Sequence, residues 1–165
     1  MKPMEKRPFQ IRRMTPKDIS EVFQIDAQTA ALYWPEKSYH FEVEKNDASR
    51  CWIAVNTNGT ILGFLILWLI VDEIHVANFA VHPEYQNQGI GTALMIHGLT
   101  CAWNEGARVS FLEVRAGNHP AIHIYQEIGY EPAGIRKNYY QDNYEDAILM
   151  NLESEAYKKL LDQQE

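Results

Sequence analysis

A short glycine-containing segment has the composition of a phosphate-binding turn. Residues 86–92 read Gln-Asn-Gln-Gly-Ile-Gly-Thr and separate a predicted strand from a long predicted helix. Such a turn exposes backbone N–H groups at a helix N-terminus, where they bind phosphate, and glycine lets the backbone approach the anion closely. Gly89 and Gly91 could equally do no more than shape a tight turn, since short glycine patterns match by chance.

Two common nucleotide-binding motifs do not fit this segment. A P-loop places Lys and then Ser or Thr after its second glycine, where this chain has Thr92 and Ala93. A dinucleotide-binding turn needs a third glycine, and Leu94 occupies its place. These differences disfavour a nucleotide-binding protein.

A single acid interrupts a predicted apolar strand. Glu113 lies within residues 109–114, and strand alternation places it on the same face as Val109 and Phe111. An unpaired carboxylate is costly among apolar groups, and a desolvated one is suited to act as a general base near neutral pH. The alternative is a buried salt bridge with Arg115 or Arg108.

A tyrosine on the next predicted helix is a possible proton donor. This helix has Asn118 as its N-cap and ends at Gly129. Tyr125 falls on its apolar face with Ala121 and Ile128, so it could be an ordinary core residue. The functional alternative is a hydroxyl that points into a cleft and donates a proton.

The order of predicted elements indicates a mixed sheet with helices on both faces. Helices are expected from Thr15, from Gly89 to about Asn104, and from Asn118 to Gly129, whereas residues 29–48 show no clear period. A turn at residues 56–60 makes a hairpin of the second and third strands, and a β-α-β-α-β order follows it. Strands are expected at residues 10–14, 51–55, 61–71, 74–81, 109–114 and 148–152.

Length and composition indicate one globular domain. The chain has 165 residues, of which 46% are hydrophobic and 22% charged, with no repeats or linkers. We expect a single domain over residues 1–165, with a disordered tail at residues 1–8 and a polar tail at residues 155–165. The net charge of −7 argues against nucleic acid as a partner and would favour a cationic one.

The cysteines and the apolar runs indicate a cytoplasmic protein with no membrane partner and no metal. Cys51 and Cys101 have apolar neighbours, which is typical of buried thiols in a reducing compartment, and neither has metal-ligand spacing. The longest apolar run, residues 61–71, is too short to cross a bilayer. The N-terminus lacks the apolar stretch of a signal peptide.

In their order and spacing, these segments resemble the GNAT superfamily of N-acetyltransferases. The resemblance covers roughly residues 74–152 and is carried by residues 78–91, 112–118 and 121–130. Residues 136–140, with paired tyrosines, and Glu145-Asp146-Ala147 resemble the RimI-type subgroup, the ribosomal-protein-alanine N-acetyltransferases. The resemblance implies an α+β fold, a three-layer α/β/α sandwich with a mixed, mostly antiparallel central sheet of about six to seven strands.

The resemblance also implies an activity. The chain would transfer an acetyl group from acetyl-CoA directly to the N-terminal α-amine of a protein, without a metal. A ribosomal protein is one possible acceptor. Glu113 matches the general base and Tyr125 the general acid that protonates the leaving thiolate. Acetyltransferases for lysine or small-molecule amines, and a non-catalytic acyl-CoA-binding sensor, stay open as alternatives, although the presence of both residues favours an enzyme.

Binding roles follow from the same resemblance. Asn118 would contact the cofactor arm, and the pantetheine chain would lie beside Phe79, Ala80 and Val81. The turn that binds the pyrophosphate would consist of Gln86, Asn87, Gln88, Gly89, Ile90, Gly91 and Thr92. The walls of the acceptor channel would be Tyr33, Trp34, Glu36, Tyr139 and Tyr140.

Overall fold

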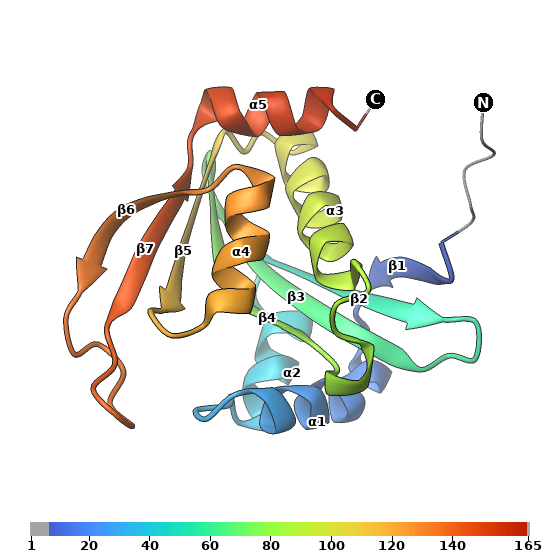
Figure 1. The fold of residues 1–165 in the computed structure, drawn as a ribbon. Coiled ribbons are helices and arrows are strands. Elements are labelled where there is room, and N and C mark those ends of the chain that lie inside the picture. The colour runs from blue at the N-terminus through green and yellow to red at the C-terminus, as the bar shows by residue number, and fades with distance from the viewer. Residues whose placement is uncertain (1–6, 165) are drawn as a thin grey trace.

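The computed structural model describes residues 7–164, so most of the predicted N-terminal tail lies outside the described residues (Figure 1). Seven strands form one sheet in the order β1-β2-β3-β4-β5-β7-β6. Only the β4–β5 pair is parallel, which confirms a mixed and mostly antiparallel sheet. The strands are β1 (Phe9–Arg13), β2 (Ser49–Asn56), β3 (Ile61–Ile70), β4 (Glu73–Val81), β5 (Val109–Arg115), β6 (Glu131–Arg136) and β7 (Ala147–Leu152).

Helices cover both faces of the sheet, as expected for three layers. They are α1 (Ile19–Thr29), α2 (Glu36–Glu44), α3 (Ile90–Asn104), α4 (His119–Ile128) and α5 (Ser154–Asp162), with short 3₁₀ helices η1 (Pro16–Asp18) and η2 (Pro83–Tyr85). Alternation along β3 feeds two cores, because Phe64 and Ile66 pack under α1 and α2, whereas Leu65 and Leu67 pack under α3. None of the helices within residues 7–164 is long and apolar enough to cross a membrane.

The sheet opens between β4 and β5. These strands pair only at Glu73–Val109, Ile74–Ser110 and His75–Phe111 in the described chain, and then diverge. A β-bulge where β4 pairs with β3 leaves Ala77 without an opposite residue, which increases the local twist. Figure 1 shows β1–β4 and β5–β7 splayed apart, with α4 in front of the opening.

Three elements escaped the sequence prediction. Residues 29–48, which had no clear period, contain α2, whose buried side includes the polar Glu42 beside Tyr39. Strand β6 contains Pro132 and Gly134, which disfavour a strand but are tolerated here because β6 is an edge strand.

The prediction of a polar C-terminal tail is wrong, because Ser154–Asp162 forms α5. Tyr157 and Leu160 are buried on its inner side, and the Tyr157 hydroxyl donates a hydrogen bond to the Leu99 carbonyl of α3. Two such residues three positions apart on one helix face are enough to dock a largely polar helix. Figure 1 shows α5 lying across the end of α3.

Replacement of Leu160 by alanine should test this docking. The side chain is almost fully buried, so Leu160→Ala should lower the free energy of unfolding by about 2–4 kcal/mol, measured by urea denaturation. The exposed Lys158 on the same helix gives the control, and Lys158→Ala should change it by less than about 0.5 kcal/mol. Equal losses in both variants would contradict a role for α5 in the core.

Candidate functional site

The turn before α3 has the backbone geometry of an anion-binding site. Gly89 is the N-cap residue and has φ +80°, and Asn87 also has a positive φ of 62°. A Cβ added at Gly89 would meet no atom within 4 Å, so the space beside this backbone is open. The first N–H groups of α3 have no acceptor inside the helix, so they are available as hydrogen-bond donors at this turn.

Gly91 has a different role from Gly89. A Cβ at this position would lie 3.0 Å from Phe79 Cζ and 3.4 Å from Ile124 Cδ1, so glycine lets α3 sit close to β4 and α4. Gly91 thus meets a packing requirement, which differs from both the anion-binding and the turn-shaping roles considered for it from the sequence.

The other residues of the turn divide into anchored and open ones. Gln86 is anchored, since its side-chain amide donates to the Val81 carbonyl at 3.1 Å. Ile90 is buried in the core, so only its backbone can reach a ligand. Asn87 and Gln88 are exposed, and Thr92 is half-buried in the first turn of α3.

The edge of β4 that faces β5 is free beyond His75. Residues 76–81, which include Phe79, Ala80 and Val81, have no β5 partner in the described chain. On this edge, Phe79 N and the Val81 carbonyl are bonded to the side chains of Asn78 and Gln86. The other backbone groups that face β5 are hydrogen-bonding sites for another extended chain.

A buried polar network holds this edge in position. The Asn78 side chain accepts from its neighbour Phe79 N at 2.9 Å and donates to the Tyr39 hydroxyl at 2.9 Å. Tyr39 in turn donates to the Asp26 carboxylate, which also accepts from Trp34 N at 3.0 Å. Burial and the adjacent Asp26 raise the pKa of Tyr39. The network ties α1, the following loop and α2 to the β4 bulge.

Tyr125 lies on the α4 side of the opening. It is only 6% exposed, and its ring centroid is 6.2 Å from that of Phe79. Its neighbour Tyr130 hydrogen-bonds to Ser110 at 2.6 Å, whereas the Tyr125 hydroxyl has no such partner within residues 7–164.

Burial also raises the pKa of Tyr125. Its hydroxyl therefore keeps its proton at neutral pH. The residue thus combines a ring packed near Phe79, as a core residue would have, with a hydroxyl that stays protonated.

The prediction that Glu113 is buried is wrong. Alternation puts Ser110, Leu112 and Val114 into the core under the helices, whereas Glu113 lies on the opposite face, where its side chain is 32% exposed. Helices α1 and α2 cover β2 and β3 on this face but do not extend over β5. An apolar strand sequence does not reveal that only one of its faces is covered.

The ion pair of Glu113 also differs from the predicted alternatives. Its partner is Arg136 of β6, with Nε 3.4 Å from Glu113 Oε1, and neither Arg115 nor Arg108 pairs with it. Tyr139 is its other neighbour, and the hydrogen bond to the Glu113 carboxylate raises the pKa of the Tyr139 hydroxyl. The structure thus brings two residues predicted for the site, Glu113 and Tyr139, together.

Ionic contacts hold the Tyr139–Tyr140 loop. The Arg115 guanidinium lies 4.0 Å from the ring centroid of Tyr140 and pairs with Asp142 at 3.0 Å. Glu145 accepts from Gly117 N at 2.7 Å and so joins this loop to the start of α4.

Asn118 follows directly after Gly117. Its side-chain oxygen accepts from Ala121 N at 3.4 Å, which confirms the predicted N-cap of α4.

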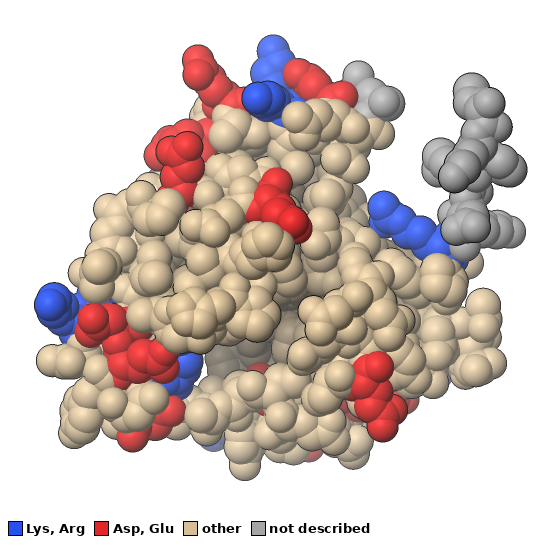
Figure 2. Space-filling view, in the orientation of Figure 1, with Lys and Arg blue, Asp and Glu red and all other residues tan. Residues whose placement is uncertain are grey.

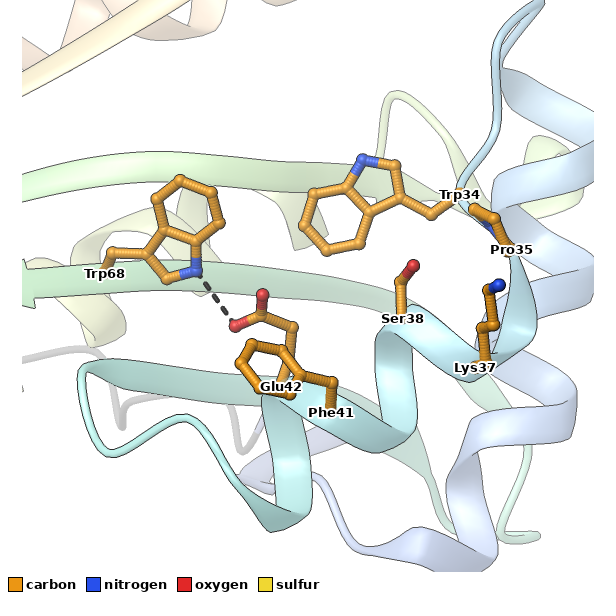
Figure 3. Close-up of a pocket in the computed structure, with 7 residues that line it drawn as sticks. All are labelled: Trp34, Pro35, Lys37, Ser38, Phe41, Glu42 and Trp68. Atoms are coloured by element: carbon orange, nitrogen blue, oxygen red, sulfur yellow. Dashed lines mark hydrogen bonds between the residues drawn. The ribbon is translucent and has the colours of Figure 1, made fainter.

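The predicted channel residues before α2 lie on a separate segment. Tyr33 is exposed, with its ring edge against Phe23, and Glu36 is exposed at the start of α2. Trp34 packs against Tyr39 at 5.5 Å between ring centroids and lines a hollow with residues of α2 and β3 (Figure 3). Figure 2 shows the face with the β4–β5 opening hollowed between α4 and α1, with mostly uncharged residues around the hollow.

Three residues near these groups were missed by the sequence analysis. Arg136 was noticed only as part of a motif, and Glu42 and Trp68, which hydrogen-bond to each other at 2.9 Å, were not singled out. The available signal was weak, because Trp68 lies within a long apolar run and Glu42 lies in a segment without a clear period.

The comparisons with known proteins agree with this geometry. Residues 17–130 match the acetyltransferase (GNAT) family. The ribosomal protein bS18-alanine N-acetyltransferase of Escherichia coli is 36% identical over 138 residues, which cover 82% of this chain and 90% of that protein.

Solved structures are similar as well. The crystal structure of the ribosomal-protein-S18-alanine N-acetyltransferase from Escherichia coli has a TM-score of 0.80 and 33% identity, and the match covers 88% of this chain and 94% of that one. Arabidopsis thaliana NAA60 in complex with acetyl-CoA shares the fold, with a TM-score of 0.79, 17% identity, and coverage of 87% and 97%.

The contact between Glu145 and Gly117 should be visible in a pH titration. The Gly117 N–H, more than any other group, lowers the pKa of Glu145 below its ordinary value of 4.5. The contact is therefore fully formed above that value and is lost as the pH falls through the lower, folded-state pKa. The Gly117 amide signal in ¹H–¹⁵N NMR should shift with a midpoint below 4.5, and Glu145→Gln should abolish the shift. A midpoint at or above the ordinary value would contradict the contact.

Proposed function

Because the chain belongs to the acetyltransferase (GNAT) family and is an N-acetyltransferase, we propose that it acetylates the α-amine of a protein N-terminus with acetyl-CoA as the donor. The observation that carries the proposal is the free edge of β4 beside the open turn at Gly89. An extended, hydrogen-bonding arm that ends in a diphosphate fits both features, since one offers strand pairing and the other offers N–H groups to an anion.

The donor is held by backbone groups in this proposal. The N–H groups at the start of α3, around Gly89 and Ile90, bind the pyrophosphate, and the β4 edge from Phe79 to Val81 binds the pantetheine arm. Asn118 contacts the same arm from the start of α4. Bound acetyl-CoA supplies a thioester as the acetyl donor, and the N–H of Val81 stabilises the negative charge that develops on its oxygen, since strand alternation turns the N–H of Ala80 toward β3.

Glu113 is the proposed general base. An α-amine has a pKa of about 7.7–8.0, against about 10.4 for lysine, so roughly one-tenth of it is already neutral at pH 7. Modest help is therefore enough, and an exposed carboxylate can take the amine proton directly or through water. The exposure of Glu113 supports the relay through water.

Tyr125 is the proposed general acid. Its burial keeps the proton on the hydroxyl, and the hydroxyl has no protein partner within residues 7–164. It can donate to the sulfur as the carbon–sulfur bond breaks and the new carbon–nitrogen bond forms. The cysteines do not take part, because burial raises the pKa of both the Cys51 and the Cys101 thiol and so disfavours the nucleophilic thiolate.

The proposed acceptor is the N-terminus of a ribosomal protein, with alanine among the candidate first residues of that acceptor. The Escherichia coli relatives that this chain resembles are named for that reaction. The acceptor chain would pass between two walls, the Tyr139–Tyr140 loop beside Glu113 and the segment with Tyr33, Trp34 and Glu36.

A peptide panel tests the proposed function. CoA release is measured with peptides that begin with alanine, serine or methionine, with an N-terminally blocked peptide that contains one lysine, and with spermidine. We expect the free α-amine peptides to react and the alanine peptide to have the highest kcat/KM. Preferred acetylation of the blocked peptide or of spermidine would replace the α-amine proposal, and acetyl-CoA binding without any transfer would favour a sensor.

Replacement of Glu113 by glutamine should slow transfer without weakening acetyl-CoA binding. We expect kcat to fall about tenfold to a hundredfold at neutral pH because the proton acceptor is lost. The deficit should shrink above about pH 8, where the α-amine loses its proton unaided. Initial rates from about pH 6.5 to about pH 9, with calorimetric binding of acetyl-CoA, measure both effects.

Glu131 of neighbouring β6 provides a matched control, because it is also an exposed glutamate. Glu131→Gln should keep the wild-type pH profile. Tyr125→Phe should instead lower kcat by a similar factor across the whole pH range, since it acts on the leaving group and not on the amine. A Glu113→Gln deficit that stays constant with pH would remove Glu113 from the base role.

A further inference from the structure

A hollow of about 430 Å³ lies between α2 and the end of β3, on the side of the sheet that carries Glu113. Aromatic side chains form most of its wall, and Figure 3 shows the indoles of Trp34 and Trp68 on either side of the space above Glu42. The lining residues are Trp34, Pro35, Lys37, Ser38, Phe41, Glu42 and Trp68.

Glu42 is the charged group of this hollow. It is only 7% exposed, and its Oε2 accepts both from Trp68 Nε1 and from Asn46 Nδ2 at 2.9 Å. Its Oε1 has no hydrogen-bond partner within residues 7–164 and is not fully enclosed. Figure 3 shows this second oxygen pointing into the space between the two indoles. A nearly buried carboxylate with one unpaired oxygen is costly unless a donor reaches it.

The chemistry of the hollow selects a cation. Indole faces attract ammonium and guanidinium groups, most strongly when the site is partly desolvated, and a carboxylate at the base adds charge pairing and a hydrogen-bond acceptor. Lys37 would oppose a cation, but Figure 3 places it beside Pro35, at the end of the hollow away from Glu42. The net charge of −7 also attracts cations to the protein, over a longer range.

The hollow lies within reach of the proposed transfer site. Trp68 pairs in register with His75 of β4, and His75 pairs with Phe111 of β5, two residues before Glu113. The rings of His75 and Phe111 are 5.4 Å apart and line the route between the two places. Two strand spacings across the sheet and two residues along β5 amount together to about 12 Å, which three to four residues of an extended peptide span.

We infer that this hollow is a specificity subsite that binds the ammonium or guanidinium group of a lysine or arginine near the third or fourth residue of the acceptor, with Glu42 and the indoles of Trp34 and Trp68 as its contacts. The inference rests on the proposed function for the identity of the acceptor. The same chemistry would also accept a free amine, and the experiment separates the two sources.

The kinetic test compares arginine with citrulline, its neutral isostere, at each of positions two to five of an otherwise neutral acceptor peptide. Arginine at the third or fourth position should raise kcat/KM about tenfold over citrulline. In Glu42→Gln the ratio should fall severalfold toward one, because glutamine keeps the shape and the acceptor for Trp68 but loses the charge, and only the indoles still favour the cation. Glu44→Gln, which removes an exposed charge from the same helix, should keep the wild-type ratio.

A ratio near one in the wild type, or an unchanged ratio in Glu42→Gln, would overturn the subsite. A binding experiment keeps this test independent of catalysis. In ¹H–¹⁵N NMR, the arginine peptide should shift the indole signals of Trp34 and Trp68 but not those of Trp52 and Trp103, which belong to the other core. The citrulline peptide also passes Trp34 on the channel wall, so it should shift the Trp34 signal but leave the Trp68 signal in place.

The same spectra distinguish the possible failures. If no peptide is acetylated but the indole shifts follow the arginine peptide, the proposed function fails and the cation site stands. If spermidine shifts both indoles at lower concentration than the arginine peptide does, the occupant is a free amine and the assignment to the acceptor chain is overturned.

Discussion

The separation of β4 from β5 is the constraint on which the rest of the structure depends. After three paired residues the two strands part, and the hydrogen-bonding groups of β4 beyond His75 lose their neighbour. Backbone groups of a strand need partners, so the opening has to be filled from outside the sheet. Three groups lie around this opening, on elements at its two sides. They are the turn at Gly89, the hydroxyl of Tyr125 and the carboxylate of Glu113.

Polar groups beneath α2 make this arrangement rigid. Asp26, Tyr39 and Asn78 satisfy one another and bind the β4 bulge to the first two helices, so the free edge has a defined path without a strand beside it. Glu42 lies on the same short helix as Tyr39 but is only half satisfied. Within one turn of α2, Tyr39 thus makes a structural contact, and Glu42, three residues later, has one oxygen without a hydrogen-bond partner among residues 7–164.

The sequence predicted the parts that depend on local pattern. Alternation and capping located β1 to β5, α3 and α4 closely, and the order of these elements led to the correct fold class. What failed depended on tertiary context. Burial of Glu113 was inferred from its apolar neighbours. Whether this face of β5 is covered depends on how far α2 extends over the sheet, and the pattern of α2 is obscured by its buried glutamate.

Strand β6 and helix α5 were not predicted from the sequence, for related reasons. Strand β6 exists because β7 lies beside it, in spite of Pro132 and Gly134. Helix α5 depends on two buried residues in a polar segment, and the pairing of Glu113 with Arg136 joins positions on strands that are far apart in sequence. Residue types and spacing contain little information about such contacts, because a partner in another element supplies the energy.

The position of the free edge of β4 in the middle of the sheet has a consequence for self-association. An uncovered strand at the border of a sheet can pair with the border of another molecule, and this is a common beginning of aggregation. Here β5 and α4 flank the uncovered strand, while β1 and β6 are the outer strands. A second sheet is too broad to enter, whereas a single slender chain can. The protein can therefore keep a strand edge without a neighbouring strand open to small molecules, without offering it as a template to its own copies.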